Sequence, residues 1–373
     1  MRILRVAQKV YPEVTGGGPY HVHALSRDQA TMGHDVTVLT VGGEAASHTG
    51  ERDGYTVIRY PATVRALGND VSVGVGEYLR SSAGEYDIVH AHSHLYFSTN
   101  LAAMARTLSG TPLSITNHGL YSQNAPEWMF DAYLRSVGKW TLDRADTVFC
   151  YTDVDRRRLR EFGVTSEVSV VPNGIDTGRF TASGPSSDLI DTDGPVVLFV
   201  GRLVEGKRPR VAVDALAGLR ARGYDARLFL CGDGPLREEL RAHAESRGIS
   251  ERVTFLGQRS YEEMPAIYRS ADVLVLPSRA EGVPRTVLEA MASGVPVVCS
   301  SLEQVEAVIG DAGTTVPVGD VEAFVDALDP FVSDPESRER AGDAGREAVD
   351  KGHDWGETVR RTTEVLEGVA RSC

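Results

Sequence analysis

Short apolar runs alternate along this chain with longer segments whose apolar residues recur at helical spacing. Such alternation is typical of βαβ units, in which buried parallel strands are joined by crossover helices. Each run is short enough for a strand and is bounded by polar or glycine-containing residues. The pattern therefore predicts two series of strands. They are residues 3–7, 35–40, 87–92, 113–118, 147–151 and 168–172, and then 196–201, 227–232, 253–257, 272–277 and 296–300.

A polar segment separates the two series. Residues 181–195 are rich in glycine, proline, serine and aspartate, which makes them the strongest linker candidate in the chain. We therefore predict an α/β fold with two doubly wound domains, residues 1–180 and 195–353, the first completed by a C-terminal helix over about 354–373. Ligands of such sheets bind beyond the carboxyl ends of the strands. Functional residues are thus expected directly after strands, in an interdomain cleft.

Composition narrows the class of protein. The net charge of −13 makes nucleic acid a poor partner, because phosphate contact needs concentrated positive charge. No apolar stretch approaches the roughly 20 residues of a membrane span. The first ten residues read as a β-strand rather than a signal peptide, so a cytoplasmic location is expected.

The cysteines carry no signal of a metal or disulfide site. Cys150, Cys231 and Cys299 each end an apolar run, and none stands at CxxC spacing. We interpret them as small buried hydrophobic residues.

Basic residues follow the first strand of the second series. Arg202 comes directly after the strand and Gly201, and Lys207 lies five residues further. A guanidinium and an ammonium on one loop suit a diphosphate, since the first can hold two oxygens and the second is a compact charge. This pattern alone is weak, and a helix start with solvated basic residues stays an open reading.

A stronger signal lies in residues 277–298. Glu281 and Glu289 stand eight residues apart in an apolar surround, which argues against solvated carboxylates. Pro284 is suited to open a helix. The backbone N–H groups of Arg285 and Thr286 would then offer a place for an anionic phosphate. Glu289 could reach a ribose diol, and Glu281 could accept hydrogen bonds from sugar hydroxyls.

These motifs resemble those of glycosyltransferase family 4, whose members are retaining enzymes with the two-domain GT-B fold. The likeness covers nearly the whole chain, and the motifs stand in the family's order. They are GGGPYHVHALSRDQATMGHDVTV (16–38), DIVHAHS (87–93), TNHG (116–119), VVPNGIDTGRF (170–180), FVGRLVEGK (199–207), CGDGPLREEL (231–240) and LEAMASGVPVV (288–298) preceded by the spaced glutamates.

The resemblance implies a role for each matching residue. Arg202 and Lys207 would hold the diphosphate and stabilise its growing charge as it leaves. Glu289 would bind the ribose, Glu281 the donor sugar, and His118 would lie against the transferred sugar. The remaining donor-binding candidates act mainly through the backbone. They are Gly17 and Gly18 of a glycine loop over 16–18, Gly257 and Arg259 beside the base, and Val283, Arg285 and Thr286 around the helix start.

The resemblance also implies that the anomeric configuration is kept. Because positive side chains and a helix N-terminus would neutralise the diphosphate, neither a metal nor a cofactor is expected. No residue stands as an obvious covalent nucleophile, so a front-face route is expected, in which a leaving phosphate oxygen helps to deprotonate the acceptor. Two positions depart from the family's pattern. Val283-Pro284 replaces Phe-Gly, and proline cannot donate a backbone hydrogen bond. SSLEQVEAV (300–308) replaces a Gly-Gly pair.

Three other interpretations are compatible with parts of the sequence. His90, His92 and His94 alternate as metal ligands on one strand face would, but no aspartate or cysteine supports them. A nucleotide-sugar epimerase on the same fold and a nucleotide-sugar-binding protein without catalysis remain alternatives, because fold does not determine function. The spacing of Glu281 and Glu289 after the basic loop favours transfer.

The acceptor and the donor's sugar and base are not readable from the motifs. A UDP- or GDP-sugar is expected as donor. The acceptor is expected to be a sugar or a lipid-linked glycan precursor, bound by N-terminal loops such as residues 65–78. The acidic excess lies mainly in the second half of the chain. The first half is therefore the side suited to an anionic surface, with peripheral contact at the inner face of a membrane.

Overall fold

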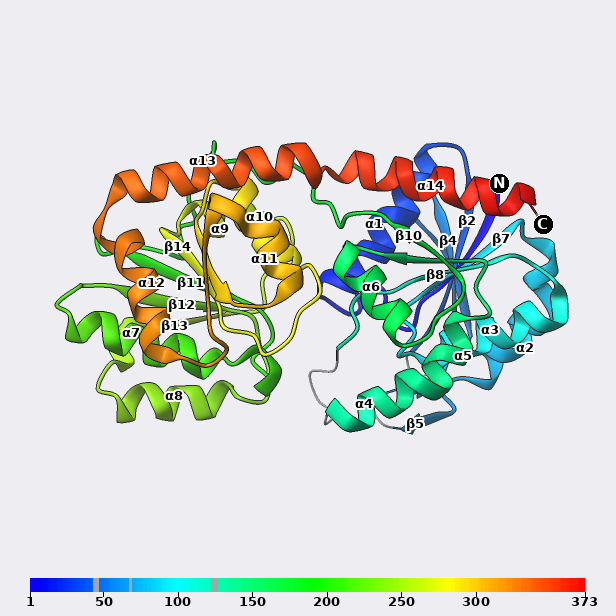
Figure 1. Ribbon diagram of the computed structural model, residues 1–373, viewed down its shortest axis with the longest axis horizontal. Coiled ribbons are helices and arrows are strands. Elements are labelled where there is room, and N and C mark those ends of the chain that lie inside the picture. The colour runs from blue at the N-terminus through cyan, green and yellow to red at the C-terminus, as the bar shows by residue number, and fades with distance from the viewer. Residues whose placement is uncertain (43–46, 67–68, 122–126, 373) are drawn as a thin grey trace. The chain divides into compact units, whose positions relative to one another are not determined.

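The computed structural model describes residues 1–42, 47–66, 69–121 and 127–372, in two compact units (Figure 1). Unit 1 takes its described residues from 1–120, 127–172 and 357–372, and unit 2 from 121 and 173–356. Residues 173–180, assigned above to the first domain, therefore belong to unit 2. Residues 67–68 of the expected acceptor loop and residue 373 lie outside the described residues.

Unit 1 is built on one sheet in the order β10-β9-β8-β7-β1-β2-β4-β3. Its strands are parallel except for β3, which pairs antiparallel with β4. All six predicted strands are present, within a few residues of the expected ends. The strands are β1 Arg2–Val6, β2 Asp35–Val41, β3 His48–Arg52, β4 Tyr55–Tyr60, β7 Ile88–His92, β8 Leu113–Thr116, β9 Thr147–Cys150 and β10 Glu167–Val170.

The β3–β4 hairpin was not predicted. The sequence of β3 is HTGER, in which apolar and polar residues do not alternate, so it lacks the hydrophobic pattern that predicts a strand. The turn nevertheless carried a signal, since Asp53 and Gly54 both adopt positive φ, at 44° and 83°. Asp-Gly is a preferred pair for a two-residue hairpin turn of this kind. A separate small pair of strands, β5 Val64–Ala66 and β6 Asn69–Val71, was also missed.

Helices cover the sheet of unit 1. They are α1 Gly17–Thr31, α2 Val73–Ser82, α3 Phe97–Ser109, α4 Glu127–Tyr133, α5 Lys139–Leu142, α6 Asp153–Glu161 and α14 Trp355–Ser372. Helix α1 begins at Gly17, inside the glycine-rich segment. The prediction of a glycine loop over 16–18 was therefore wrong for Gly17 and Gly18, which form the first turn of α1. Gly16 is the N-cap, with φ 135°, a conformation that favours glycine.

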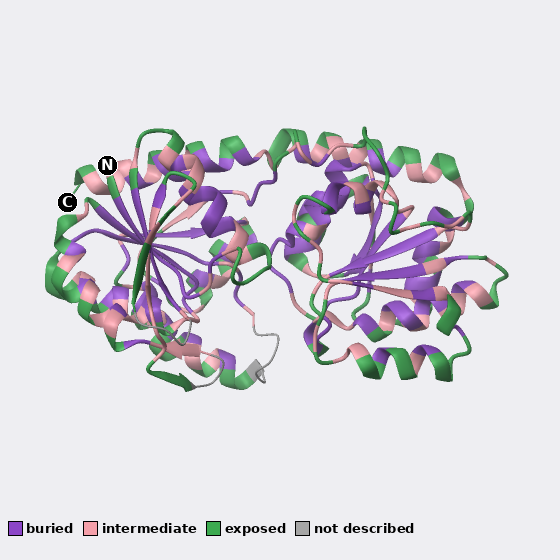
Figure 2. Cartoon of the chain, turned by 180° about the vertical axis from the view of Figure 1, so that it is seen from behind, coloured by how far each residue is buried: buried purple, intermediate pink, exposed green. Residues whose placement is uncertain are grey.

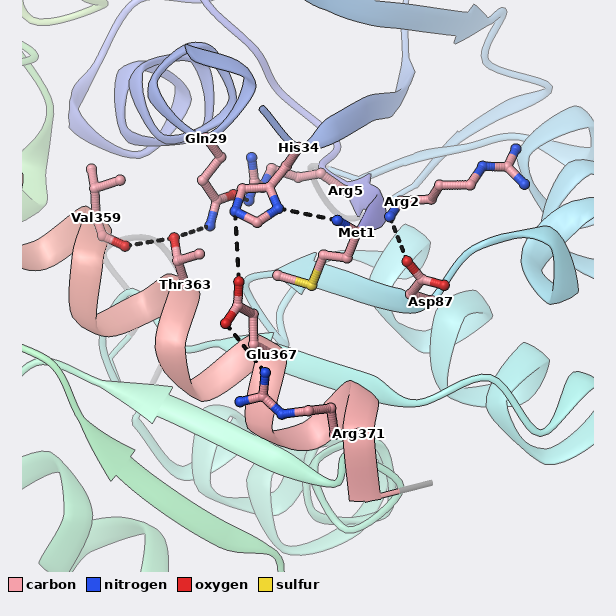
Figure 3. A network of polar contacts seen from close by, with 10 residues as sticks. All are labelled: Met1, Arg2, Arg5, Gln29, His34, Asp87, Val359, Thr363, Glu367 and Arg371. Carbon is pink, nitrogen blue, oxygen red and sulfur yellow. Dashed lines mark hydrogen bonds and ion pairs between the residues drawn. The ribbon is translucent and has the colours of Figure 1, made fainter. Parts of the chain in front are cut away.

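The C-terminal helix α14 docks on unit 1 through polar contacts (Figure 3). Gln29 on α1 donates to the hydroxyl of Thr363 at 2.8 Å and accepts from the fully buried guanidinium of Arg5 on β1. His34 lies 4.0 Å from Glu367 and 3.3 Å from the N-terminal amino group. These contacts join segments from both ends of the chain in one unit, which takes in residues 357–372 of this helix.

Unit 2 contains a parallel sheet in the order β13-β12-β11-β14-β15-β16. The five predicted strands are present, and β16 was missed because its GTTV lacks a strongly apolar run. In Figure 2 the central strands of both sheets are buried, the edge strand β3 is largely exposed, and the other exposed residues lie mainly on the helices and loops. The strands are β11 Val196–Val200, β12 Arg227–Cys231, β13 Val253–Gly257, β14 Val273–Leu276, β15 Val297–Ser300 and β16 Gly313–Val316.

Each strand of unit 2 is followed by one α-helix, and α13 follows the last of these, α12. The helices are α7 Pro209–Ala221, α8 Arg237–Ser246, α9 Met264–Arg269, α10 Arg285–Ala292, α11 Glu303–Ile309, α12 Val321–Ser333 and α13 Pro335–Gly352. Among the described residues, no helix combines the length and apolar character needed to cross a membrane.

Candidate functional site

The strand order of unit 2 places two candidate loops side by side. β11 has β12 on one side and β14 on the other, so the chain changes direction across the sheet at β11. In such sheets a crevice for ligands opens at the carboxyl ends of the strands on either side of this switch. The loops after β11 and β14 carry the predicted Arg202, Lys207 and Glu281. A backbone hydrogen bond of 2.9 Å from Arg279 to Gly206 ties the two loops together.

Lys207 and Glu281 form an ion pair through the lysine ammonium and one carboxylate oxygen. Their side chains are only 15% and 4% exposed, so this pair is largely shielded from water. Arg202, on the same loop as Lys207, is exposed. The structure thus brings Lys207 and Glu281 together, with a second cation on the loop of Lys207.

Glu289 is buried on α10 and held by two partners. Its carboxylate accepts a 2.9 Å hydrogen bond from the hydroxyl of Tyr268 and lies 3.6 Å from the guanidinium of Arg285. Burial raises the pKa of Glu289, and Arg285 opposes that rise. The expectation that neither Glu281 nor Glu289 is solvated is confirmed, since each is 5% exposed.

Helix α10 begins directly after Pro284, where the sequence predicts a helix start. Pro284 is the N-cap and the helix begins at Arg285. Val283 is buried, and its carbonyl accepts a hydrogen bond from Asn173 at 3.3 Å. The hydroxyl of Thr286 is buried and has no hydrogen-bond partner within the described part of the chain. The first N–H groups of any α-helix lack intrahelical partners, so this end of α10 can accept an anion.

Arg285 does more than supply a backbone N–H group. Its guanidinium donates to the carbonyl of Gly174 at 2.8 Å and to the hydroxyl of Tyr261 at 3.0 Å, in addition to facing Glu289. It therefore joins the start of α10 to residues near the beginning of unit 2. This role could not be predicted from the sequence, because these partners are distant along the chain.

Two glycines after β12 allow the neighbouring loops to pack closely. A Cβ on Gly232 would lie 2.0 Å from the carbonyl oxygen of Gly201, and one on Gly234 would lie 2.4 Å from that of Leu203. In the sequence these glycines stand out only as part of the family motif CGDGPLREEL (231–240). They support the loop that carries Arg202.

Gly257 and Arg259 lie at the end of β13 and just beyond it. Gly257 has φ 73°, which favours glycine. The guanidinium of Arg259 folds back onto the carbonyl of Leu256, at 2.8 Å from Nε, and lies 3.5 Å from Glu263. Because this side chain is engaged within its own loop, a contact to a base would fall mainly to the backbone.

The candidate residues of unit 1 gather at the carboxyl ends of its central strands. His118 lies two residues beyond β8 and is partly buried. One ring nitrogen contacts the hydroxyl of Tyr151, which follows β9, at 2.6 Å, and the other contacts His92, the last residue of β7, at 3.1 Å. Gly17 and Gly18 belong to this unit as well, in α1, and a Cβ on Gly18 would meet no atom within 4 Å.

The alternating histidines are engaged in hydrogen bonds or packing. His90 is fully buried, with its two ring nitrogens 3.4 Å from the guanidinium of Arg5 and 2.8 Å from the hydroxyl of Thr116. His94 packs beside the rings of Phe130 and Tyr133. No cluster of three or more side chains able to hold a metal ion occurs among the described residues.

The buried histidines predict acid lability of unit 1. Burial lowers the pKa of His94 to about 4, so this ring stays neutral in the native protein while the unfolded chain takes up a proton below about pH 6.5. The free energy of unfolding should therefore fall between pH 6.5 and pH 4, by about 2 kcal/mol at pH 5 from His94 alone. Denaturant unfolding of His94→Gln at pH 7 and pH 5 should show a smaller loss than the wild-type protein. An identical pH dependence in the two proteins would contradict this account.

Comparison with known proteins gives the family. Residues 15–179 match glycosyltransferase family 4, and residues 185–348 match the glycosyl transferases group 1. The phosphatidyl-myo-inositol mannosyltransferase of Mycobacterium leprae is 30% identical over 96% of this chain and 95% of its own length. The glycogen synthase of Mycobacterium tuberculosis is 29% identical over 98% and 94%.

A solved structure shows the same fold. HepE of Anabaena, in complex with UDP and glucose, matches with a TM-score of 0.81 and 19% identity over 98% of this chain and 99% of its own. The predicted fold, GT-B with two Rossmann-like domains, is thereby confirmed. The chain belongs to glycosyltransferase family 4 and is a glycosyltransferase.

Proposed function

We propose that this glycosyltransferase takes a sugar from a UDP- or GDP-type donor and transfers it, with retention of configuration, to an acceptor hydroxyl. The observation that carries the proposal is the shielded ion pair between Lys207, on the loop after β11, and Glu281, on the loop after β14. The exposed Arg202 lies on the same loop as Lys207. Such a site offers two cations for a diphosphate and a buried carboxylate for sugar hydroxyls.

The ion pair leaves both partners able to bind a donor. An ammonium has three N–H donors, so Lys207 can hold Glu281 and a phosphate oxygen at once. A carboxylate has several acceptor positions, so Glu281 can hold Lys207 and still accept from sugar hydroxyls. Arg202 would supply the second phosphate contact and the N-terminus of α10 a third. Glu289, anchored by Tyr268 and Arg285, would present its remaining acceptor capacity to the ribose.

Retention is proposed from the likeness to glycosyltransferase family 4, and the front-face route from the absence of a suitable pair of carboxylates among the described candidate residues. A retaining hydrolase places two carboxyl groups close together, one of them as nucleophile. Here Glu281 is engaged with Lys207, and Glu289 with Tyr268 and Arg285. We therefore propose a front-face reaction. The bond from the anomeric carbon to the diphosphate breaks, the acceptor oxygen bonds on the same face, and its proton passes to an oxygen of the leaving diphosphate.

The acceptor is proposed to be a sugar or a lipid-linked hydroxyl. The named activity of the M. leprae relative concerns a phosphatidylinositol lipid. Unit 1 exposes large apolar side chains on α3, α4, α5 and the π-helical turn 134–138 between the last two. They are Leu108 (71% exposed), Trp128 (71%), Met129 (42%), Val137 (48%) and Trp140 (39%). Tryptophan favours the interface of a membrane, so these residues support peripheral contact with a lipid surface.

Donor binding without a metal provides the test. UDP or GDP, at about 100 times its Kd, should raise the melting temperature by roughly 3 to 4 °C. Because side chains and a helix end neutralise the diphosphate, the shift should be the same in excess EDTA and with added Mg²⁺ or Mn²⁺. A shift that appears only with a divalent cation would refute metal independence. No shift with any nucleoside diphosphate would refute the donor class.

A further inference from the structure

His118 is held from both sides by residues of the two neighbouring strands. β8 lies between β7 and β9 in the sheet of unit 1. His92 at the end of β7 contacts Nε2 of His118 through its own Nδ1 at 3.1 Å, and Tyr151 after β9 contacts Nδ1 at 2.6 Å. Both ring nitrogens of His118 are therefore engaged within unit 1.

The contact distances favour one assignment of the protons. Hydrogen bonds donated by N–H to oxygen cluster near 2.9–3.0 Å, whereas those donated by hydroxyl groups are typically shorter. The 2.6 Å contact thus fits donation from the Tyr151 hydroxyl to a bare Nδ1 of His118. A neutral imidazole has one N–H group, so the proton of His118 then lies on Nε2 and is donated to Nδ1 of His92.

The surroundings oppose a charge on His118. The titratable groups around it are His21 on α1, with ring centroids 5.4 Å apart, His92 on β7, Tyr151 after β9, and His90 and His94, whose charges would repel one on His118. None of these is a carboxylate that would stabilise an imidazolium. Burial lowers the pKa of His118 to about 4 and that of His92 well below its usual value. Arg5, which lies beside His90, adds a positive charge that lowers the pKa of His92 further.

We propose that Tyr151 and His92 are positioning residues that hold His118 as a single neutral tautomer, protonated at Nε2, with its ring orientation fixed. His118 then meets the transferred sugar as a rigid, uncharged group and exchanges no proton during the reaction. The role in catalysis rests on the proposed function and on the family resemblance, by which His118 would lie against that sugar. The tautomer does not rest on it.

Nitrogen NMR of ¹⁵N-histidine-labelled protein tests the tautomer directly. The chain has ten histidines, and the signals of His118 are those missing from His118→Gln. In the wild-type protein Nε2 should be protonated and Nδ1 bare, unchanged from pH 8 to about pH 5. In Tyr151→Phe the two tautomers should mix, and the titration midpoint should move toward 6.5, because the neutral ring has lost a hydrogen bond that favoured it.

Tyr55→Phe is the matched control. Tyr55 is another buried tyrosine of unit 1 whose hydroxyl contacts a histidine, His23, at 3.0 Å. Removing that hydroxyl should leave the His118 signals unchanged. Unchanged His118 signals in Tyr151→Phe, with a folded protein, would overturn the proposal.

Kinetics test the link to the reaction. Tyr151→Phe should lower kcat about tenfold with KM nearly unchanged, because orientation acts on the chemical step, and kcat should acquire a new dependence on pH between 5 and 7. His92→Asn, whose side-chain oxygen can still accept from Nε2, should retain more activity than His92→Leu. A changed NMR spectrum with unchanged kinetics would overturn the positioning role. Failure of the wild-type protein to transfer any sugar would count against the proposed function alone, and the NMR result would still decide the tautomer.

Discussion

Arg202→Ala should reduce turnover by about 10²-fold or more at saturating donor, with no loss of stability. An interaction that strengthens as charge develops on a leaving group contributes about 2.7–4 kcal/mol to the barrier. Arg202 is exposed on the loop after β11, so its truncation leaves no cavity. Steady-state kinetics with a saturating nucleotide sugar, together with a melting curve, measure both effects.

Arg241→Ala is the control for Arg202→Ala. Arg241 lies on α8 of the same unit with a side chain 53% exposed, and it belongs to no candidate loop. Its variant should match the wild-type protein in turnover. Near-normal turnover in Arg202→Ala would remove this residue from the diphosphate site.

Lys207→Ala should lose both activity and stability. It removes a phosphate contact, which should lower turnover by about 10²-fold or more. It also leaves Glu281 as a buried carboxylate without its cation, and breaking a buried pair in this way typically costs about 3–5 kcal/mol. Urea unfolding and steady-state kinetics of the same preparation separate the two effects.

The double variant Lys207→Ala/Glu281→Gln shows which effect causes the loss of activity. A neutral glutamine needs no cation, so most of the stability should return. Activity should stay low, because the phosphate contact and the carboxylate for the sugar are both missing. Recovery of activity along with stability would show that Lys207 serves the fold and not the reaction.

The site in unit 2 was readable because its chemistry is local in sequence. Arg202 and Lys207 share one loop, and Glu281 and Glu289 stand at fixed spacing around a proline that opens a helix. Their burial followed from the apolar residues around them. The strand order cannot be predicted from the spacing of these residues. That order places β11 beside β14 and so brings Lys207 to Glu281.

The site in unit 1 shows the opposite case. His118 was recognised by its motif, but its partners Tyr151 and His92 come from other strands, and only the sheet order brings them together. The early start of α1 was missed because three successive glycines favour a loop. Gly16 alone carries the unusual backbone conformation, while Gly17 and Gly18 are helical. Local propensity was overridden there by the packing of the helix that follows.

The stereochemistry of the product tests the central claim most directly. NMR of a reaction containing a UDP- or GDP-sugar and candidate sugar or lipid acceptors should show a new glycosidic linkage with the donor's anomeric configuration kept, and one nucleoside diphosphate released for each linkage. An inverted linkage would contradict the front-face reaction. Conversion of the nucleotide sugar into its epimer, with no acceptor consumed, would contradict transfer itself.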